Sequence, residues 1–190
     1  LSPTATTAPT LTPLGPNAGL PEAVHRCLVF DDLNADGAAE LLLVPEPDAI
    51  GVPPVPHIYQ PRGDGTFEAI PVPLGAIHFQ VTACAAADLD RDGVMDLAFA
   101  VEGLTLVFLR GTGDLEYEPF GFQTPELTPA IGTAFALQGL NWLDYDRDGW
   151  PDLYVPLEAD LAADSCEFTD RDMTCFGPPV HRSQAWLLHN

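Results

Sequence analysis

The sequence has 190 residues, 46% of them hydrophobic, and a formal net charge of −21 that arises from 28 Asp and Glu residues against seven Arg and no Lys. This length and apolar content allow one buried core, which excludes a disordered acidic polymer. The negative charge repels nucleic acid and anionic membranes, and no apolar run approaches the roughly 20 residues that span a bilayer. We therefore expect no nucleic-acid partner and no direct membrane insertion.

The first 20 residues are rich in Pro, Thr and Ala and show neither a helical nor a strand period. Such a segment buries little surface and favours extended conformations, so residues 1–20 are predicted to be a linker or stalk. The chain starts at Leu1 and not at Met, which indicates a processed or trimmed chain from which any signal peptide has been removed.

An acidic nonapeptide recurs three times beyond this segment. Its copies begin at residues 32, 88 and 144, so that consecutive copies lie 56 residues apart. They read DLNADGAAE, DLDRDGVMD and DYDRDGWPD. Each copy lies between two short apolar runs, such as Cys27–Phe30 and Leu41–Val44 around the first, and such runs are typical of buried strands. Each nonapeptide is therefore predicted to connect the strands of a β-hairpin.

A second hairpin follows the acidic loop in the first two repeats. Its turns are predicted at Arg62–Gly65 and at Gly111–Asp114, where glycine permits a tight reversal. Two hairpins make four strands, which is a propeller blade. The predicted fold is all-β, with three repeats of about 56 residues as four-stranded antiparallel blades. The blades cover residues 21–75, 76–131 and 132–190, and the third contains an insertion at residues 158–179 and is incomplete at its C-terminal end.

Oxygen-bearing side chains occupy positions 1, 3, 5 and 9 of each nonapeptide, and glycine occupies position 6. This pattern suits a hard cation, because alternate residues of a tight loop point inward and the glycine lets the position-7 carbonyl approach the ion. Calcium is preferred to magnesium because its larger shell adapts to a cage of many protein oxygens. The predicted ligands of three calcium sites are Asp32, Asn34, Asp36, Ala38 and Glu40; Asp88, Asp90, Asp92, Val94 and Asp96; and Asp144, Asp146, Asp148, Trp150 and Asp152.

Two other metal sites are excluded by residues at or beyond the loops. An EF-hand loop requires Glu at position 12 and a helix, whereas Leu43, Phe99 and Val155 stand there and the chain continues as strand. Zinc is not expected because no Cys or His lies within the nonapeptides.

A blade with D-x-[DN]-x-D-G-x-x-[DE]-L between two strands, followed by a Gly-rich turn, resembles the FG-GAP/VCBS repeat family of integrin α-chain propellers and many secreted bacterial proteins. The resemblance covers about residues 21–190. It implies structural calcium in the first hairpin of each blade and partner binding on the opposite face of the propeller. Glu40 departs from the usual Asp at position 9, which suggests a looser first site.

Three blades are fewer than the four to eight that close a propeller. The third repeat ends inside a hairpin, which leaves an unpaired strand, and open edges pair readily with other chains. Either the sequence is a piece of a longer polypeptide, or several copies assemble; alternatively, residues before Asp32 supply an outer strand.

Four cysteines are present. Cys166 and Cys175 lie nine positions apart in an acidic stretch and are predicted to form a loop-closing disulfide in an oxidising compartment. Cys27 and Cys84 lie in apolar, strand-like runs and are predicted to be two separate, buried, unpaired side chains.

No catalytic motif is apparent. The three serines lack a nucleophile-elbow context, and the sequence has neither an H-E-x-x-H motif nor a glycine-rich phosphate loop. We expect a non-catalytic, extracellular calcium-binding module for protein or glycan recognition or scaffolding. The alternatives are a self-assembling surface or filament protein, a lectin with Trp150 as sugar contact, a non-catalytic part of a larger secreted enzyme or lectin, and a propeller-based hydrolase or lyase. The tripeptide Arg62-Gly63-Asp64 matches the integrin-recognition sequence, but it falls where the repeat requires a tight turn.

Overall fold

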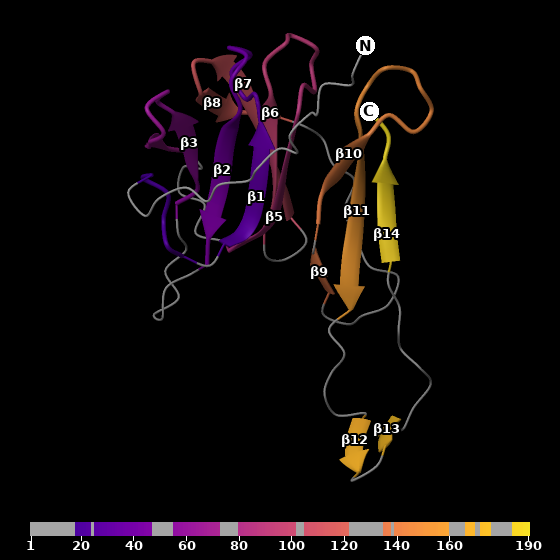
Figure 1. Ribbon diagram of the computed structural model, residues 1–190. Coiled ribbons are helices and arrows are strands. Elements are labelled where there is room, and N and C mark those ends of the chain that lie inside the picture. The colour runs from indigo at the N-terminus through magenta and orange to yellow at the C-terminus, as the bar shows by residue number, and fades with distance from the viewer. Residues whose placement is uncertain are drawn as a thin grey trace, which may run out of the picture.

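The computed structural model describes residues 18–23, 25–46, 55–72, 80–101, 105–121, 135–137, 139–159, 166–169, 172–175 and 184–190. The regular elements in these ranges are all β-strands, arranged in three antiparallel sheets and one separate hairpin (Figure 1). The predicted all-β class with antiparallel blades is confirmed.

We call the three sheets blades 1, 2 and 3. Blade 1 has the order β1-β2-β3-β4 and blade 2 the order β5-β6-β7-β8, so that each is a four-stranded meander, as predicted. The strands of blade 1 are β1 (His25–Asp31), β2 (Glu40–Pro45), β3 (His57–Pro61) and β4 (Phe67–Pro71). Those of blade 2 are β5 (Val81–Ala87), β6 (Asp96–Val101), β7 (Thr105–Gly113) and β8 (Glu116–Pro119).

Blade 3 has a divided inner strand. Both β9 (Phe135–Leu137) and β10 (Asn141–Leu143) pair with β11 (Asp152–Ala159), and β14 (Gln184–Leu188) pairs with the other edge of β11. Within the described residues, no strand pairs with the outer edge of β14. The insertion contains β12 (Cys166–Thr169) and β13 (Asp172–Cys175), which pair with each other and place Cys166 opposite Cys175 in the register. The side chains of this hairpin lie outside the described part, so the bridge between them stays a prediction.

The turn of the second hairpin differs between the blades. In blade 1 it lies at residues 62–66, as predicted, and is closed by a hydrogen bond from the Arg62 amide to the Thr66 carbonyl. In blade 2 the predicted turn at Gly111–Asp114 is wrong, because β7 continues to Gly113. The reversal instead occurs at Asp114 and Leu115, which both have positive φ (49° and 60°), the conformation of a two-residue hairpin turn with the twist of the strands.

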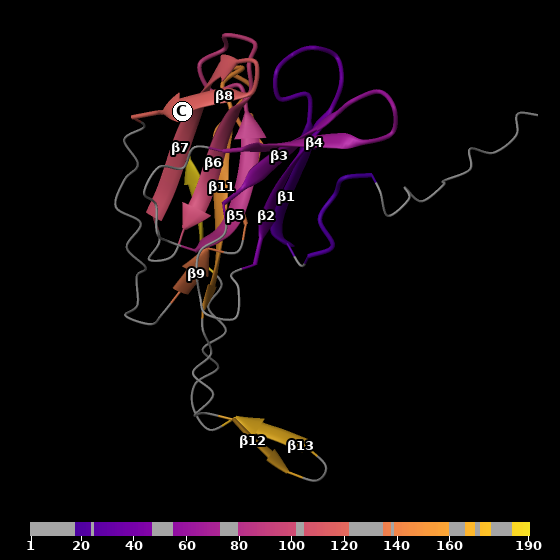
Figure 2. The ribbon, with the colours of Figure 1, turned by 90° about the vertical axis from the view of Figure 1, so that its left-hand side faces the viewer.

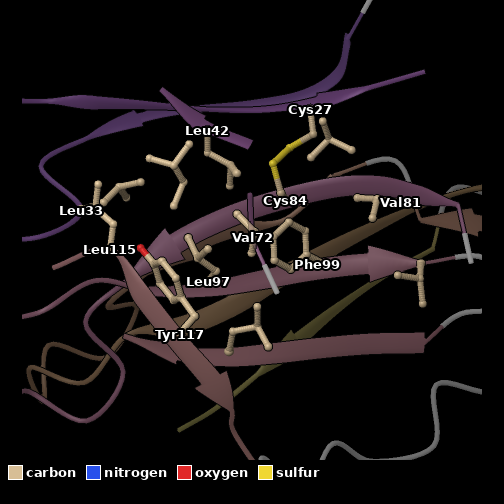
Figure 3. Close-up of a cluster of buried hydrophobic side chains, with 14 residues drawn as sticks. Cys27, Leu33, Leu42, Val72, Val81, Cys84, Leu97, Phe99, Leu115 and Tyr117 are labelled. Atoms are coloured by element: carbon tan, nitrogen blue, oxygen red, sulfur yellow. A yellow bond between two sulfur atoms is a disulfide. The ribbon is translucent and has the colours of Figure 1, made fainter. Parts of the chain in front are cut away.

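Blade 2 lies between the other two blades (Figures 1 and 2). One hydrophobic cluster joins blades 1 and 2 and includes Leu42, Val44 and Ile58 of blade 1. Figure 3 shows Leu42 on the side of this cluster opposite Leu97 and Phe99 of blade 2. A second cluster joins blades 2 and 3. Since β6 faces a neighbour on both sides, all six of its residues are buried, whereas in β1 only Cys27 is buried. Burying one such large apolar side chain contributes about 1.5–3 kcal/mol.

Cys27 of β1 and Cys84 of β5 form a disulfide bond, with a Cα–Cα distance of 5.7 Å (Figure 3). The prediction of two unpaired cysteines is therefore wrong. Their sequence separation is 57, one more than the repeat of 56. Because successive strand residues point to opposite faces, this extra residue turns Cys84 toward blade 1, whereas Ala83, the repeat equivalent of Cys27, faces blade 3. The bond crosses from one blade to the next.

The N-terminal residues of the described part contact blade 1. Ala18 is buried, and its carbonyl accepts a hydrogen bond of 2.8 Å from the Phe67 amide in β4. Ordered packing therefore starts before residue 20, at the outer edge of the first blade.

Candidate metal centre

The three acidic loops share one backbone conformation, and we number their positions 1 to 9 from Asp32, Asp88 and Asp144. Each loop joins two strands, and its position-9 residue is the first residue of the second strand. The residue at position 4 has a positive φ of 62°, 62° and 65°, and the glycine at position 6 has a φ of 89°, 90° and 86°. These left-handed residues reverse the chain within a few positions, and they explain why glycine recurs at position 6.

The oxygen-bearing side chains at positions 1, 3 and 5 are oriented by backbone amides of their own loop. In the second loop, Asp88 accepts hydrogen bonds from the amides of Asp92 (3.0 Å) and Gly93 (2.9 Å). Asp90 accepts from the Asp92 amide (3.2 Å), and Asp92 accepts from the Val94 amide (2.9 Å). The first loop repeats all four bonds and the third loop repeats three of them. Each carboxylate retains lone pairs that these amides do not use.

The position-9 carboxylates are the buried charges of the described chain. Glu40, Asp96 and Asp152 are at most 1% exposed. Each accepts a hydrogen bond from the amide of position 2 in its own loop, at 2.9, 2.8 and 3.1 Å respectively. Burial raises the pKa of the Glu40 and Asp96 carboxyls, against the opposing effect of these amide hydrogen bonds. A cation beside them would stabilise their charged forms.

The second oxygen of the position-9 carboxylate has a hydrogen-bond donor in blades 2 and 3 but not in blade 1. Asp96 Oδ1 accepts from the Gly111 amide (2.9 Å), and Asp152 Oδ1 accepts from the Asn190 amide (3.1 Å). The register places Pro61 at the equivalent position of blade 1, and proline has no N–H. Glu40 Oε1 is consequently buried without a hydrogen-bond partner. A buried carboxylate oxygen of this kind is costly unless something positive lies beside it.

The loops also bring several carboxylates together. In the second loop, oxygens of Asp88, Asp90 and Asp96 lie within 4.8 Å of one another, and Asp144, Asp146 and Asp152 make the same group in the third. The first loop has Asn34 at position 3, whose amide nitrogen donates to Asp36 (3.0 Å). The first loop thus carries one charge fewer than the other two.

Two basic side chains that the loop pattern does not reveal reach these loops, Arg110 from the third strand of blade 2 and His189 from the position directly after the third strand of blade 3. Arg110 forms ion pairs with Asp90 (2.7 Å) and Asp92 (3.1 Å), and the hydrogen bond to Asp92 is the main cause that raises its pKa. His189 lies 3.0 Å from Asp146, and this contact raises the pKa of its imidazole. Each of them directly follows the strand residue that pairs with position 10, the residue after the nonapeptide: Leu109 pairs with Leu97, and Leu188 pairs with Leu153. This spacing is the signal in the sequence that could have identified them.

The second and third loops contact each other through Arg91. Its guanidinium lies 4.1 Å from the centroid of the Trp150 ring, and its Nη2 donates to the Asp148 carbonyl (3.4 Å). The first and second loops have Ala35 and Val94 at the corresponding positions and lack such a pair. One face of the Trp150 ring is therefore covered, which limits its use as a stacking platform for a sugar.

The Arg62-Gly63-Asp64 tripeptide lies in the exposed turn between β3 and β4. Arg62 forms an ion pair with Glu68 (3.0 Å). Asp64 accepts hydrogen bonds from the amide (2.9 Å) and hydroxyl (2.6 Å) of Thr66, and the hydroxyl bond is the main cause that lowers its pKa. Both charged side chains thus stabilise the turn itself.

The side chains of the three loops offer oxygen ligands, which fits a hard cation. His189 adds one nitrogen beside the third loop, so the premise that no histidine is near the loops holds for the sequence but not for the fold. Residues 32–99 match the family model described as an FG-GAP-like repeat. That segment begins at position 1 of the first loop and contains the whole second loop. A comparison with curated proteins found no match. Residues 32–99 are therefore similar to an FG-GAP-like repeat, and the structure builds them as parts of antiparallel blades of the β-propeller type.

Proposed function

We propose that this chain is a non-catalytic, extracellular β-propeller-type module whose three acidic loops each bind one calcium ion. The loops would use the side chains at positions 1, 3, 5 and 9 and the carbonyl of position 7. The observation that supports this most is the buried position-9 carboxylate at the base of every loop, together with the unpartnered Glu40 Oε1. A divalent cation is the simplest group that offsets buried and clustered negative charge without further hydrogen-bond donors.

Repulsion between the loop carboxylates explains why bound calcium would stabilise the fold. Two like charges about 4 Å apart repel by about 4 kcal/mol at an effective dielectric constant near 20. Eleven of the 28 acidic residues lie in the three nonapeptides, so bound calcium would remove much of the strain that the net charge imposes. The amide hydrogen bonds hold the carboxylates in place before the ion arrives, which lowers the cost of ordering them on binding.

One structural observation supports the extracellular location. The Cys27–Cys84 bond is of a kind that persists in oxidising compartments, and extracellular fluids hold enough calcium for weak sites of this type. No helix in the described ranges is long and apolar enough to cross a membrane. The recognition surface for a protein or glycan would then be the end of the blades away from the loops, since all three loops lie along one end (Figure 1).

Thermal unfolding with and without calcium tests the proposal. At a free calcium concentration of 100 times Kd, one site stabilises the folded state by about 2.7 kcal/mol. We expect the melting temperature to fall when EDTA replaces calcium, and magnesium at equal concentration to restore less of it.

A matched pair of variants makes the test specific. Asp96→Asn removes a proposed ligand and should reduce the calcium-dependent part of the stability, whereas Asp64→Asn removes the same charge from a turn outside the loops and should not. An unchanged melting curve in EDTA, or equal effects of the two variants, would contradict calcium binding at the loops.

A further inference from the structure

The two end blades expose apolar faces that are distinct from the metal loops. On blade 1, Leu28 is 60% and Phe30 is 67% exposed. On blade 3, Leu143, Tyr154 and Leu187 are 41%, 40% and 45% exposed. These are the outward faces of the first and last sheets, whose opposite faces pack on blade 2.

The 56-residue repeat shows which residues of blade 2 are equivalent to the exposed residues of blade 1. Leu28 and Phe30 are equivalent to Cys84 and Ala86. In blade 2 these two residues belong to the cluster that packs against blade 1. The exposed face of blade 1 is therefore equivalent to the face with which blade 2 packs on the preceding blade in the chain.

The exposed face of blade 3 corresponds to the other side of blade 2. Tyr154 is equivalent to Ala98, and its cross-strand partner Leu187 is equivalent to Phe108, the partner of Ala98. Ala98 and Phe108 belong to the cluster that packs against blade 3. The exposed face of blade 3 is therefore equivalent to the face with which blade 2 packs on the next blade in the chain. Such a face packs on a face of the kind that blade 1 exposes.

We propose that two copies of this chain associate head to tail, with the blade 3 face of each copy packed on the blade 1 face of the other. The internal interfaces of the chain provide the template for this contact, since each already joins one face of either kind. Head-to-tail contacts form a closed ring when the rotation between copies closes. The three blades that the structure describes, taken from two copies, make six, which is within the four to eight of closed propellers.

The template also fixes the register of the contact. Cys27 and Cys84 face each other between blades 1 and 2, and the equivalent pair between blades 2 and 3 is Ala83 and Leu140, both buried in the second cluster. Continuing the series, Gly139 of one copy should face Leu28 of the other. Cysteines at these two positions should then lie within the usual Cα–Cα range of a disulfide, as Cys27 and Cys84 do at 5.7 Å.

Sedimentation equilibrium in calcium at physiological ionic strength tests the association. The expected mass is twice the 20.4 kDa of one chain. Phe30→Asp and Leu187→Asp change exposed side chains on opposite faces, and each should shift the protein to monomer while calcium binding stays close to that of the parent. This separates failure of the association from failure of calcium binding. A parent chain that stays monomeric, or that forms a ladder of larger species, overturns the proposal.

Mixing and cross-linking test the direction of the contact. Phe30→Asp mixed with Leu187→Asp retains one intact interface and should give mixed dimers, whereas contacts between identical faces would leave Leu187→Asp able to pair with itself through blade 1. The double variant Leu28→Cys/Gly139→Cys should form covalent dimers on oxidation, with the bridge mapped by mass spectrometry. The single variant Leu28→Cys should not, and a Leu28→Cys homodimer bridge would overturn the head-to-tail arrangement.

Discussion

The disulfide between Cys27 and Cys84 should be a major source of the stability of this chain. The two residues are 57 apart in the sequence, so the bond closes a long loop and restricts the unfolded chain strongly. The chain-entropy relation gives a loss of about 14 cal/mol/K for a loop of this size, which corresponds to about 4 kcal/mol at 25 °C. For a chain of this length, we expect the melting temperature to fall by about 8–16 °C when the bond is reduced.

The measurement is urea unfolding of the oxidised and reduced forms in excess calcium. It is made in the Cys166→Ala/Cys175→Ala background, so that reduction affects only the bond between the blades and removes no core atom. Thiol titration of the folded, oxidised protein should detect no free thiol. Two free thiols, or a difference in unfolding free energy below about 1 kcal/mol, would refute the reasoning that this bond links distant parts of the chain.

Three further predictions concern single side chains. Arg91→Ala removes the contact with Trp150 and should lower the calcium affinity of the third loop by less than tenfold while leaving the first loop unchanged, as checked by calorimetry; equal effects on both loops would contradict the contact's role. Burial, followed by the charges of nearby carboxylates, raises the pKa of Tyr117; the stability it contributes is therefore full below a pH of about 10 and is lost above it. Tyr117→Phe should accordingly reduce the loss of stability at alkaline pH, and an unchanged alkaline unfolding curve would count against this. Gly111→Ala places a Cβ 2.6 Å from a backbone carbonyl oxygen and should cost about 1–3 kcal/mol, whereas Gly121→Ala meets no neighbouring atom and should be nearly neutral, both measured by urea unfolding.

Most of the fold could be predicted from the repeat in the sequence. Three copies of one nonapeptide at a constant spacing, each between apolar runs, were enough to predict four-stranded blades and to place the acidic loops between the first two strands. The local hydrogen bonds of the loops follow from the same pattern, since a glycine and short acidic side chains at these spacings fold back on their own amides.

The contacts between repeats were harder to predict. The partners of Arg110 and His189 come from another strand, and a pattern of loop residues alone does not reveal them. Cys27 and Cys84 were missed for a different reason. Their separation exceeds the repeat by one residue. This offset predicts that the two cysteines face each other only when it is known that adjacent blades stack face to face.

The turn of blade 2 was misplaced because glycine was taken as the sign of the reversal. Gly111 serves instead to let β7 pass close to the Met95 carbonyl, where a Cβ would lie 2.6 Å away. Its amide then reaches Asp96. The glycine is thus required by the packing of the acidic loop, and the true turn at Asp114 and Leu115 carries no glycine.

The number of calcium ions bound per chain tests the central claim most directly. Equilibrium dialysis against calcium up to several millimolar should give three bound ions per chain, since extracellular sites of this kind have dissociation constants of about 10⁻⁴–10⁻³ M. Asp152→Asn should reduce the count to two. A chain that binds no calcium over this range would contradict the account.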